Sequence, residues 1–412
     1  MNSRQRVITA INHRQPDKVP VDLGATPSSG ISTIAYHNLR KHLNINNIPV
    51  KVYDVVQQLA EPEWEIIDRF NIDILDIGRA FNTDSDQWKN ITLPGNIPVR
   101  FPGWFKHRID KNGVWYASNQ KGQEIAKMPP GATFFDQTQF PYFDKYPDNF
   151  KDLPKAMELV MWAAFPVPPW DHANDDHFWK ELREKTIELK STNKALVIGV
   201  GCNLFEWGSF LRRLDNFLMD LVMNPLNVEA LLDALMELHL DTLDKVCKAV
   251  GDIADIVKFG DDLGTGMGPI MSPETYRKYF KPRHTKLCEF VRENSKMHTM
   301  LHSCGSVYKL IPDLIEAGFE ILNPVQTNSR DMDPAILKKE YGKEITFWGG
   351  GVDTATVLNN GTTEEVRKQV LKRLEIFSKG GGYVFNTVHN ILPDVPPENI
   401  ITMFKAIEEF NS

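Results

Sequence analysis

Residues 296–305 read Lys-Met-His-Thr-Met-Leu-His-Ser-Cys-Gly, a short apolar run that ends in a His-x-Cys pair and a glycine. A helical pattern follows, so the stretch is typical of a strand that turns into a helix. Strand side chains alternate between two faces, which predicts that His302 and Cys304 project to the same side. An imidazole nitrogen beside a thiolate sulfur suits a borderline-soft divalent ion, zinc above all. The alternative is that both are buried core side chains.

The same strand-to-helix rhythm recurs along most of the chain. Short apolar strands that alternate with helices indicate a parallel sheet, and eight such units indicate an α/β fold of the (β/α)8 TIM-barrel type. No repeat or low-complexity linker divides the chain, so we expect one barrel domain over residues 1–412. The predicted strands cover residues 19–24, 71–78, 195–200, 254–259, 320–323, 346–348 and 382–385, together with a strand within 296–305 that ends at His302 and Cys304.

Residues 79–144 have a different character, with frequent glycines, prolines and aromatic residues. Alternating runs at 113–117 and 123–128 predict antiparallel hairpins. We interpret this stretch as a β-rich insertion within the barrel rather than an independent domain, because no large apolar core accompanies it. Its aromatic side chains are candidates to close over an apolar substrate, and the alternative is a structural flap or the surface of a homodimer. These side chains are Trp104, Trp115, Tyr116, Phe134 and Phe135.

Composition excludes several classes of protein. The 412 residues carry a formal charge of −7 with lysine and arginine thinly spread, which argues against a nucleic-acid partner. Four cysteines without paired spacing indicate reduced thiols. The N-terminus has no apolar signal core, and no run approaches the roughly 18 apolar residues that a membrane span requires. We therefore expect a cytoplasmic protein without a membrane partner.

Polar residues gather where the predicted strands end, which is where TIM barrels place their active sites. Asp261 and Asp262, together with Glu206 and Asp22, are candidates for proton transfer, although Asp also caps turns through backbone hydrogen bonds. The other strand-end residues are candidates to bind substrate or metal. They are Asn203, Gln326, Asp353, Asn386 and His389.

A metal at His302 and Cys304 needs at least one more ligand. No cysteine follows Cys304, so the candidates are His389, Glu206, Gln326 and the Asp261/Asp262 pair. His389 lies far along the chain, but closure of the barrel brings the end of its strand to the same mouth. Three protein ligands leave a coordination position open for substrate, as in catalytic zinc sites.

Five stretches of the chain resemble the uroporphyrinogen decarboxylase superfamily. The resemblance implies a (β/α)8 barrel from one of two branches. One branch decarboxylates the acetate arms of a porphyrinogen without metal, and the other comprises zinc methyltransferases that move methyl groups to or from a corrinoid protein. The stretches are residues 260–264 (Gly-Asp-Asp-Leu-Gly), 271–274, 302–305, 348–353 and 393–399.

The two branches differ at positions that can be read here. Decarboxylases carry an arginine-rich signature after the first strand to hold many carboxylates, whereas residues 15–39 contain no arginine. The methyltransferases place His-x-Cys and a later cysteine on zinc. His302 and Cys304 match the pair, and His389 stands near the place of the second cysteine. Histidine for cysteine makes the metal a stronger Lewis acid, suited to polarising an ether oxygen.

The resemblance therefore implies a zinc-dependent methyltransferase, with His302, Cys304 and His389 on Zn²⁺. The methyl group would move between a corrinoid protein and a small molecule, either a methyl-ether donor or a thiol or pterin acceptor. Cobalamin is expected from a partner, since the chain contains no corrinoid-binding domain. The alternatives are a metal-free decarboxylase of a porphyrinogen or a smaller acid, with an aspartate as general acid, and a barrel that only binds or scaffolds. Metal content separates the zinc methyltransferase from the metal-free decarboxylase.

Overall fold

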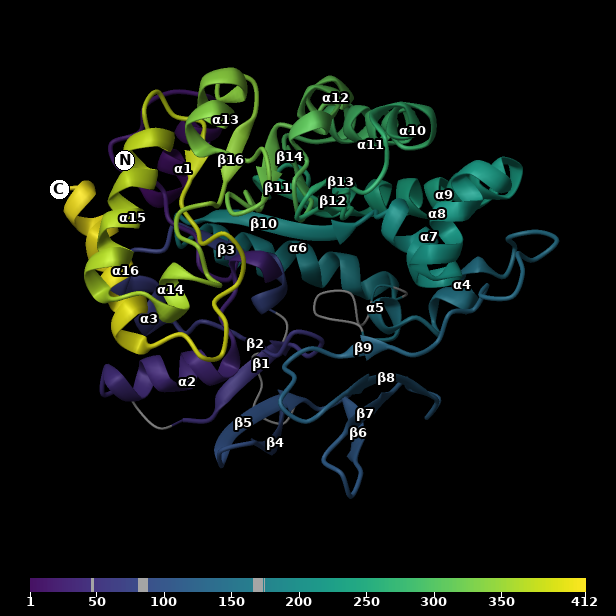
Figure 1. Cartoon of the computed structure of the whole chain (residues 1–412), viewed down its shortest axis with the longest axis horizontal. Coiled ribbons are helices and arrows are strands. Elements are labelled where there is room, and N and C mark those ends of the chain that lie inside the picture. The colour runs from purple at the N-terminus through teal and green to yellow at the C-terminus, as the bar shows by residue number, and fades with distance from the viewer. Residues whose placement is uncertain (46–47, 81–87, 166–172, 174) are drawn as a thin grey trace.

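The computed structural model describes residues 1–45, 48–80, 88–165, 173 and 175–412. Within these residues, seven parallel strands form a curled sheet in the order β17-β16-β15-β14-β11-β10-β3, with helices on its outer side (Figure 1). The α/β prediction is confirmed, and the architecture resembles a TIM barrel. The strands are β3 (Ile74–Asp76), β10 (Ala195–Gly201), β11 (Ile256–Gly260), β14 (His298–His302), β15 (Ile321–Asn323), β16 (Thr346–Trp348) and β17 (Tyr383–Val384).

The predicted first strand is reduced to a bridge. Val21 pairs in parallel with Phe385, directly after β17, and the Asp22 N–H donates to the Phe385 carbonyl at 2.9 Å. On the other side, the Asp73 N–H donates to the Val21 carbonyl at 2.8 Å, just before β3. Pro20 has no N–H to extend the ladder, and Gly24 turns the chain with a φ of +86°. Residues 20–22 thus link both edges of the curled sheet without forming a full strand.

Helices cover the outer face of the sheet, and a large apolar cluster fills the space between the two layers. A smaller cluster that includes Ile256, Met300 and Trp348 fills the interior of the sheet. The helices are α1 (Ser3–Ile11), α2 (Thr33–His42), α3 (Trp64–Arg69), α4 (Leu153–Met157), α5 (Met161–Ala164), α6 (Asp176–Lys190), α7 (Phe205–Arg212), α8 (Leu214–Met223), α9 (Pro225–Val250), α10 (Pro273–Tyr279), α11 (Lys281–Asn294), α12 (Ile311–Ala317), α13 (Pro334–Tyr341), α14 (Val357–Asn360), α15 (Thr363–Phe377) and α16 (Pro397–Phe410), with 3-10 turns η1 (Pro27–Ser29), η2 (Ile77–Ala80) and η5 (Tyr308–Leu310).

Two small sheets, one mixed and one antiparallel, lie to one side of the barrel, where Figure 1 shows β4 to β8 below the central sheet. The predicted hairpins are present, but the first small sheet also includes β1 and β2, which precede residue 79. The strands are β1 (Val50–Asp54), β2 (Leu59–Ala60), β4 (Trp88–Leu93) and β5 (Ile97–Pro102) in one small sheet, and β6 (Lys106–Ile109), β7 (Trp115–Ser118), β8 (Glu124–Met128) and β9 (Asp136–Gln137) in the other; β12 (Gly264–Thr265) and β13 (Gly268–Pro269) form a separate hairpin.

The expectation that this β-rich region lacks an apolar core is wrong. A second buried cluster holds both small sheets together and includes Val52, Phe101 and Phe105. Trp115 and Phe135 are 4% and 3% exposed inside it, so these two rings are structural and are not available to cover a substrate. The hairpins supply enough β-branched and aromatic side chains on one face to exclude water there.

The β-rich region contacts the barrel at the loops that follow its strands. The Asn390 amide, after β17, donates to Gln57 Oε1 at 3.0 Å. Gln137 of β9 donates to the Phe210 carbonyl of α7 at 2.6 Å. These contacts join the region to the end of the barrel where the predicted site lies. No helix among the described residues combines the length and apolarity that a membrane span requires.

Candidate metal centre

Three predicted ligands meet at the C-terminal ends of the strands. One donor atom each from His302, Cys304 and His389 lies within 4.8 Å of the other two. The Nε2 atom of His302 is 3.5 Å from Cys304 Sγ, and the two imidazole rings meet edge to face with centroids 6.3 Å apart. Among the candidates for a third ligand, His389 is the residue that joins His302 and Cys304 in this cluster.

The cluster fits a zinc ion in spacing and in chemistry. A tetrahedral zinc with Zn–N near 2.0 Å and Zn–S near 2.3 Å separates the two donors by roughly 3.5 Å. Burial lowers the pKa of His302 to about 4 and also lowers the pKa of His389, so both rings are neutral, as ligands must be. Burial raises the pKa of Cys304, so the thiol keeps its proton in the absence of a cation. Binding of a metal would release this proton, because the thiolate is the ligand.

His302 is held in the orientation that a ligand needs. Its Nδ1 lies 3.2 Å from Oδ1 of Asn323, at the end of the neighbouring strand β15. Asn323 is itself fixed, because Oδ1 accepts from Ser28 Oγ at 2.7 Å and Nδ2 donates to the Trp348 carbonyl at 3.3 Å. Since Asn323 occupies Nδ1, the free Nε2 faces Cys304.

The turn that carries Cys304 is held from two sides. The Cys304 N–H donates to Asp262 Oδ1 at 2.8 Å, and the same oxygen lies 3.6 Å from His302 Nε2. The Gly305 N–H donates to Gln326 Oε1. Gly305 has a φ of +83° and packs on Gly264 so closely that a Cβ on either residue meets backbone atoms at 2.4–2.5 Å. Asp262 and Gln326 therefore position the His-x-Cys turn.

Asp261 and Asp22 are tied to the protein around them. Asp261 is fully buried and accepts the N–H groups of Leu204, Phe205 and Glu206 at 2.9–3.2 Å, so it anchors the N-terminus of α7. Asp22 accepts from the Ala25 N–H and from Trp348 Nε1, at 3.0 and 2.8 Å. Burial raises the pKa of Asp22 to about 6.

Glu206 has the properties of a proton donor. It lies in the first turn of α7 and accepts from the Asn203 amide at 2.5 Å. Burial raises its pKa well above the usual range, and the charges of Asp262 and Asp261 raise it further. A carboxyl group whose pKa is raised in this way holds its proton more tightly than an exposed glutamate, which is the property that a general acid needs.

The remaining predicted binding residues differ in their surroundings. Asp353 accepts from the N–H groups of Ala355 and Thr356 at 2.9 and 3.1 Å and so caps its own turn. Asn386 is 2% exposed, and neither atom of its amide has a hydrogen-bond partner. Four residues were predicted to bind substrate: Asn203, Gln326, Asp353 and Asn386. Asn386 is the one of these four whose side-chain polar atoms both lack a partner among the described residues.

The sequence places Asn323 at the end of a strand but does not show its role behind His302, and sequence reasoning missed Lys258, whose charge acts on His302. Lys258 stands in an otherwise apolar strand, β11 (Ile-Val-Lys-Phe-Gly), and a cation at such a position was a readable signal. The role of Asn323 gave no signal of this kind, because its contact with His302 depends on which strands become neighbours.

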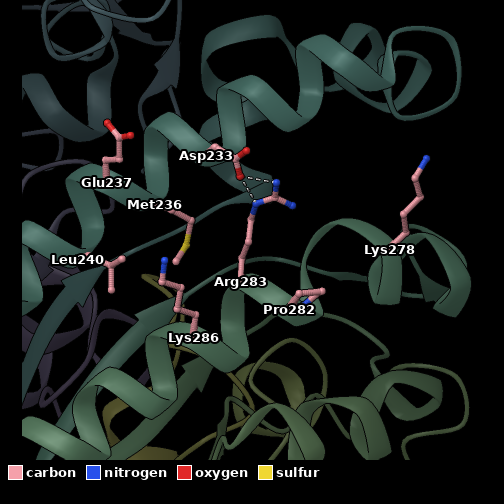
Figure 2. Close-up of a pocket in the computed structure, with 8 residues that line it drawn as sticks. All are labelled: Asp233, Met236, Glu237, Leu240, Lys278, Pro282, Arg283 and Lys286. Atoms are coloured by element: carbon pink, nitrogen blue, oxygen red, sulfur yellow. Dashed lines mark hydrogen bonds and ion pairs between the residues drawn. The ribbon is translucent and has the colours of Figure 1, made fainter.

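A groove on the outer surface is separate from this centre. It has a volume of about 440 Å³ and lies among α9, α10 and α11, where Arg283 and Asp233 form an ion pair across it (Figure 2). None of the strand-end residues lines it. The groove therefore has no part in the chemistry of the cluster.

Comparisons with known proteins bear on both fold and family. A methyltransferase from Methanosarcina mazei superposes over 100% of both chains with a TM-score of 0.58 at 18% identity, which shows a shared fold. Among curated sequences, the methylcobamide:CoM methyltransferase MtaA of Methanosarcina barkeri is 29% identical over 157 residues, 38% of this chain and 42% of its own. A uroporphyrinogen decarboxylase of Pseudoalteromonas translucida is 37% identical over 75 residues, 18% of this chain.

The matched stretch spans only 20% of that decarboxylase, less than the share of MtaA that is matched. The family model is broader than either pairwise match. The model described as uroporphyrinogen decarboxylase (URO-D) covers residues 191–410, from just after α6 to the end of α16, and includes His302, Cys304 and His389. Because this is more than half of the 412 residues, the chain belongs to the uroporphyrinogen decarboxylase family.

Proposed function

We propose that this protein is a zinc-dependent methyltransferase that moves a methyl group between a small substrate, a methyl ether, and a corrinoid carried by a separate protein. The observation that carries the proposal is the meeting of His302, Cys304 and His389 at the mouth of the curled sheet. The similarity to MtaA, a relative named as a methylcobamide methyltransferase, supports methyl transfer to or from a corrinoid.

The loop after residue 22 favours methyl transfer over porphyrinogen decarboxylation. In this loop Ser28 and Ser29 are buried, and Ser28 Oγ contacts Asn323 behind His302. Residues 15–39 offer no arginine to hold the carboxylates of a tetrapyrrole. This segment therefore supports the metal ligand His302 through Ser28 and Asn323, and it lacks the arginines that would bind a polyanionic substrate.

The residues divide the work as follows. His302, Cys304 and His389 would hold the ion, and the ion would supply a Lewis acid for the substrate oxygen. Asn323 and Asp262 orient the His-x-Cys pair. Glu206, whose pKa is raised by burial, donates its proton to the ether oxygen as the C–O bond breaks, and Asn203 fixes its position.

The overall transfer balances without another reagent. The electron pair of cob(I)alamin forms the bond to the methyl carbon, the C–O bond breaks, and the ether oxygen leaves as an alcohol or phenol with the proton from Glu206. A second proton from solvent restores Glu206. The corrinoid is a substrate here, bound to its own protein.

The test is a spectroscopic assay with free cobalamin and zinc-loaded protein. Cob(I)alamin with methoxybenzene as donor should be converted to methylcobalamin, at a rate at least about 100-fold above a protein-free blank. The Cys304→Ser variant should fall to the blank. If neither this reaction nor the demethylation of methylcobalamin by a thiol exceeds the blank, the proposal is wrong.

A metal-free decarboxylase is the second candidate, because Glu206 can also protonate a carbanion after loss of CO₂. It predicts full activity in metal-depleted protein and in Cys304→Ser. Release of CO₂ from uroporphyrinogen or a smaller acid, retained after chelation, would establish it in place of methyl transfer.

A further inference from the structure

Two buried histidines contact the turn that carries Glu206, and the proposed mechanism does not yet use them. His239 on α9 is 6% exposed, and His284 on α11 is 1% exposed. The turn comprises residues 201–206, from the end of β10 to the first turn of α7. Neither histidine belongs to the candidate metal centre. Buried polar side chains are costly unless they are bonded, so the contacts of these two rings indicate their role.

The backbone of this turn is held in an uncommon conformation. Gly201 has a φ of +70° and Cys202 has a φ of +54°, so two consecutive residues have a positive φ. A residue with a side chain adopts such a conformation rarely, and it persists there only where the surrounding structure enforces it. Conformations of this kind cluster at functional sites. The turn therefore depends on the groups that hold it, and the two histidines are among them.

His239 holds the first part of the turn. Its Nε2 lies 2.8 Å from the Asn203 carbonyl oxygen. Burial lowers the pKa of His239 to about 4, so the ring is neutral, and its proton is on Nε2 because a carbonyl oxygen can only accept. The Asn203 amide in turn donates to Glu206 Oε2 at 2.5 Å. A Cβ at Gly260 would lie 2.7 Å from that amide nitrogen, so Asn203 occupies space that a glycine leaves.

His284 holds the second part of the turn through Asp261. Its Nε2 lies 3.3 Å from Asp261 Oδ2, and its Nδ1 lies 3.0 Å from the Tyr276 hydroxyl. Burial raises the pKa of Tyr276, so the hydroxyl keeps its proton and can donate a hydrogen bond to Nδ1. The imidazole proton then lies on Nε2, toward the carboxylate that accepts the backbone N–H groups of the turn. His284 therefore supports the group that anchors residues 204–206.

Both sets of contacts converge on Glu206. The contacts of His239 lead through Asn203 to the Glu206 carboxyl group. The contacts of His284 lead through Asp261 to the Glu206 N–H, which donates to Oδ1 at 2.9 Å. A buried histidine thus stands behind the side chain and another behind the backbone of the same residue. Misplacement of a reacting group by about 1 Å lowers a rate by about 100-fold, so this double support matters for proton transfer.

We propose that His239 and His284 are positioning residues for proton transfer by Glu206. Tyr276 supports His284 in this role. Both rings are buried behind the turn, and they act through its backbone and side chains rather than on the substrate. This inference rests on the proposed function, which assigns the proton of Glu206 to the leaving oxygen. Loss of either ring slows proton transfer and leaves the candidate metal centre able to bind zinc.

The test compares two aryl methyl ethers with different leaving groups, in the cob(I)alamin assay with the zinc-loaded full chain. Methoxybenzene releases a strongly basic phenolate that needs a proton, whereas 4-methoxybenzonitrile releases a less basic anion that leaves with less help. We expect His239→Leu and His284→Leu to lower the rate with methoxybenzene by about 10–100-fold and the rate with the nitrile by no more than about fivefold. Glu206→Gln should show the same pattern. His239→Gln and His284→Gln keep a donor near the Nε2 position and should recover most of the wild-type rate.

Two tyrosines of α10 supply a matched pair of variants. Tyr276→Phe removes only the hydroxyl behind His284 and should slow methoxybenzene by about threefold to tenfold, with little effect on the nitrile. This variant keeps the test decisive if a leucine variant fails to fold. Tyr279→Phe is the control, because its buried hydroxyl donates to the Leu221 carbonyl at 2.8 Å and should affect neither rate. Every variant should hold as much zinc as wild type.

The assay separates failure of this inference from failure of the proposed function. Wild-type activity tests the proposed function, and the ratio of the two rates tests the inference. Histidine variants as fast as wild type with methoxybenzene, or slowed equally with both ethers, would overturn the positioning role. Wild type that transfers no methyl group from either ether would overturn the proposed function and this inference with it.

Discussion

Asn323 Oδ1 lies 3.2 Å from Nδ1 of His302, and this contact determines which imidazole nitrogen faces Cys304. The Asn323 amide cannot turn without breaking its bond to the Trp348 carbonyl, so it presents an acceptor and not a donor to the ring. His302 therefore has its proton on Nδ1 and its lone pair on Nε2, the tautomer that a metal at the cluster would require.

Removal of this support should weaken metal binding. We expect Asn323→Ala to lower zinc affinity by about 10–100-fold, the range for loss of a group behind a histidine ligand. Competition with a fluorescent chelator measures the affinity. Ser28→Ala is the matched control, because it removes the other bond to the same oxygen and leaves the His302 contact intact. Equal affinities in wild type and Asn323→Ala would contradict the orienting role.

The packing of Gly264 on the Cys304 turn gives a second prediction. A Cβ at Gly264 meets the Cys304 carbonyl at 2.5 Å, so Gly264→Ala should displace the turn, reduce zinc affinity and lower the melting temperature. Gly266, in the same hairpin, has open space around it, and Gly266→Ala should leave both quantities unchanged. Equal losses of zinc affinity and stability in Gly264→Ala and Gly266→Ala would show that any change in the hairpin has this effect. The contact of Gly264 with the Cys304 turn would then not be its cause.

Asp22 predicts a specific dependence of stability on pH. Its pKa is raised by burial to about 6, so the folded state holds a proton that the unfolded chain, with a pKa near 3.8, has lost. Stability due to this group is therefore present at low pH and is lost as pH rises from about 4 to 6. A rise of about two in the pKa of Asp22 corresponds to about 2–3 kcal/mol in the free energy of unfolding.

Asp22→Asn removes this titration. The difference in the free energy of unfolding, variant minus wild type, should increase in favour of the variant between pH 4 and 6 and then level off. Urea denaturation followed by tryptophan fluorescence measures it. A difference that stays constant across this range would mean that Asp22 does not carry the proton.

The adjacent aspartates should differ in their effect on stability. Asp261→Asn presents an NH₂ group to backbone donors at the start of α7, and leaving them unmatched costs about 1–3 kcal/mol. Asp262 is more exposed, and Asp262→Asn should change stability by less than about 1 kcal/mol while weakening metal binding. Chemical denaturation of metal-free protein separates the two. Equal destabilisation by both variants would exclude an anchoring role specific to Asp261.

Much of this fold can be read from the sequence, because each barrel strand is a short apolar run next to a helical pattern. Strands β10 to β17 of the central sheet lie where the pattern placed them, within a few residues. The first predicted strand is only a bridge at Val21, because pairing there depends on Pro20 and on the curvature of the finished sheet. The second apolar core was missed because its members come from segments far apart, from Val52 to Phe165.

The candidate site divides in the same way. His302 and Cys304 follow from strand alternation, and closure of the sheet correctly predicted that His389 lies near them. The roles of the acids do not follow from sequence, since Asp261 and Asp262 are neighbours with opposite surroundings.

The central claim is that His302, Cys304 and His389 bind one zinc ion. The most direct measurement is metal content by mass spectrometry on protein purified without a histidine tag, for wild type, His302→Ala, Cys304→Ser and His389→Ala. The account predicts about one zinc per chain in wild type and loss of zinc in each variant, with unchanged folding by circular dichroism. Wild type that holds no zinc after reconstitution, or a His389→Ala variant with full zinc content and affinity, would contradict it.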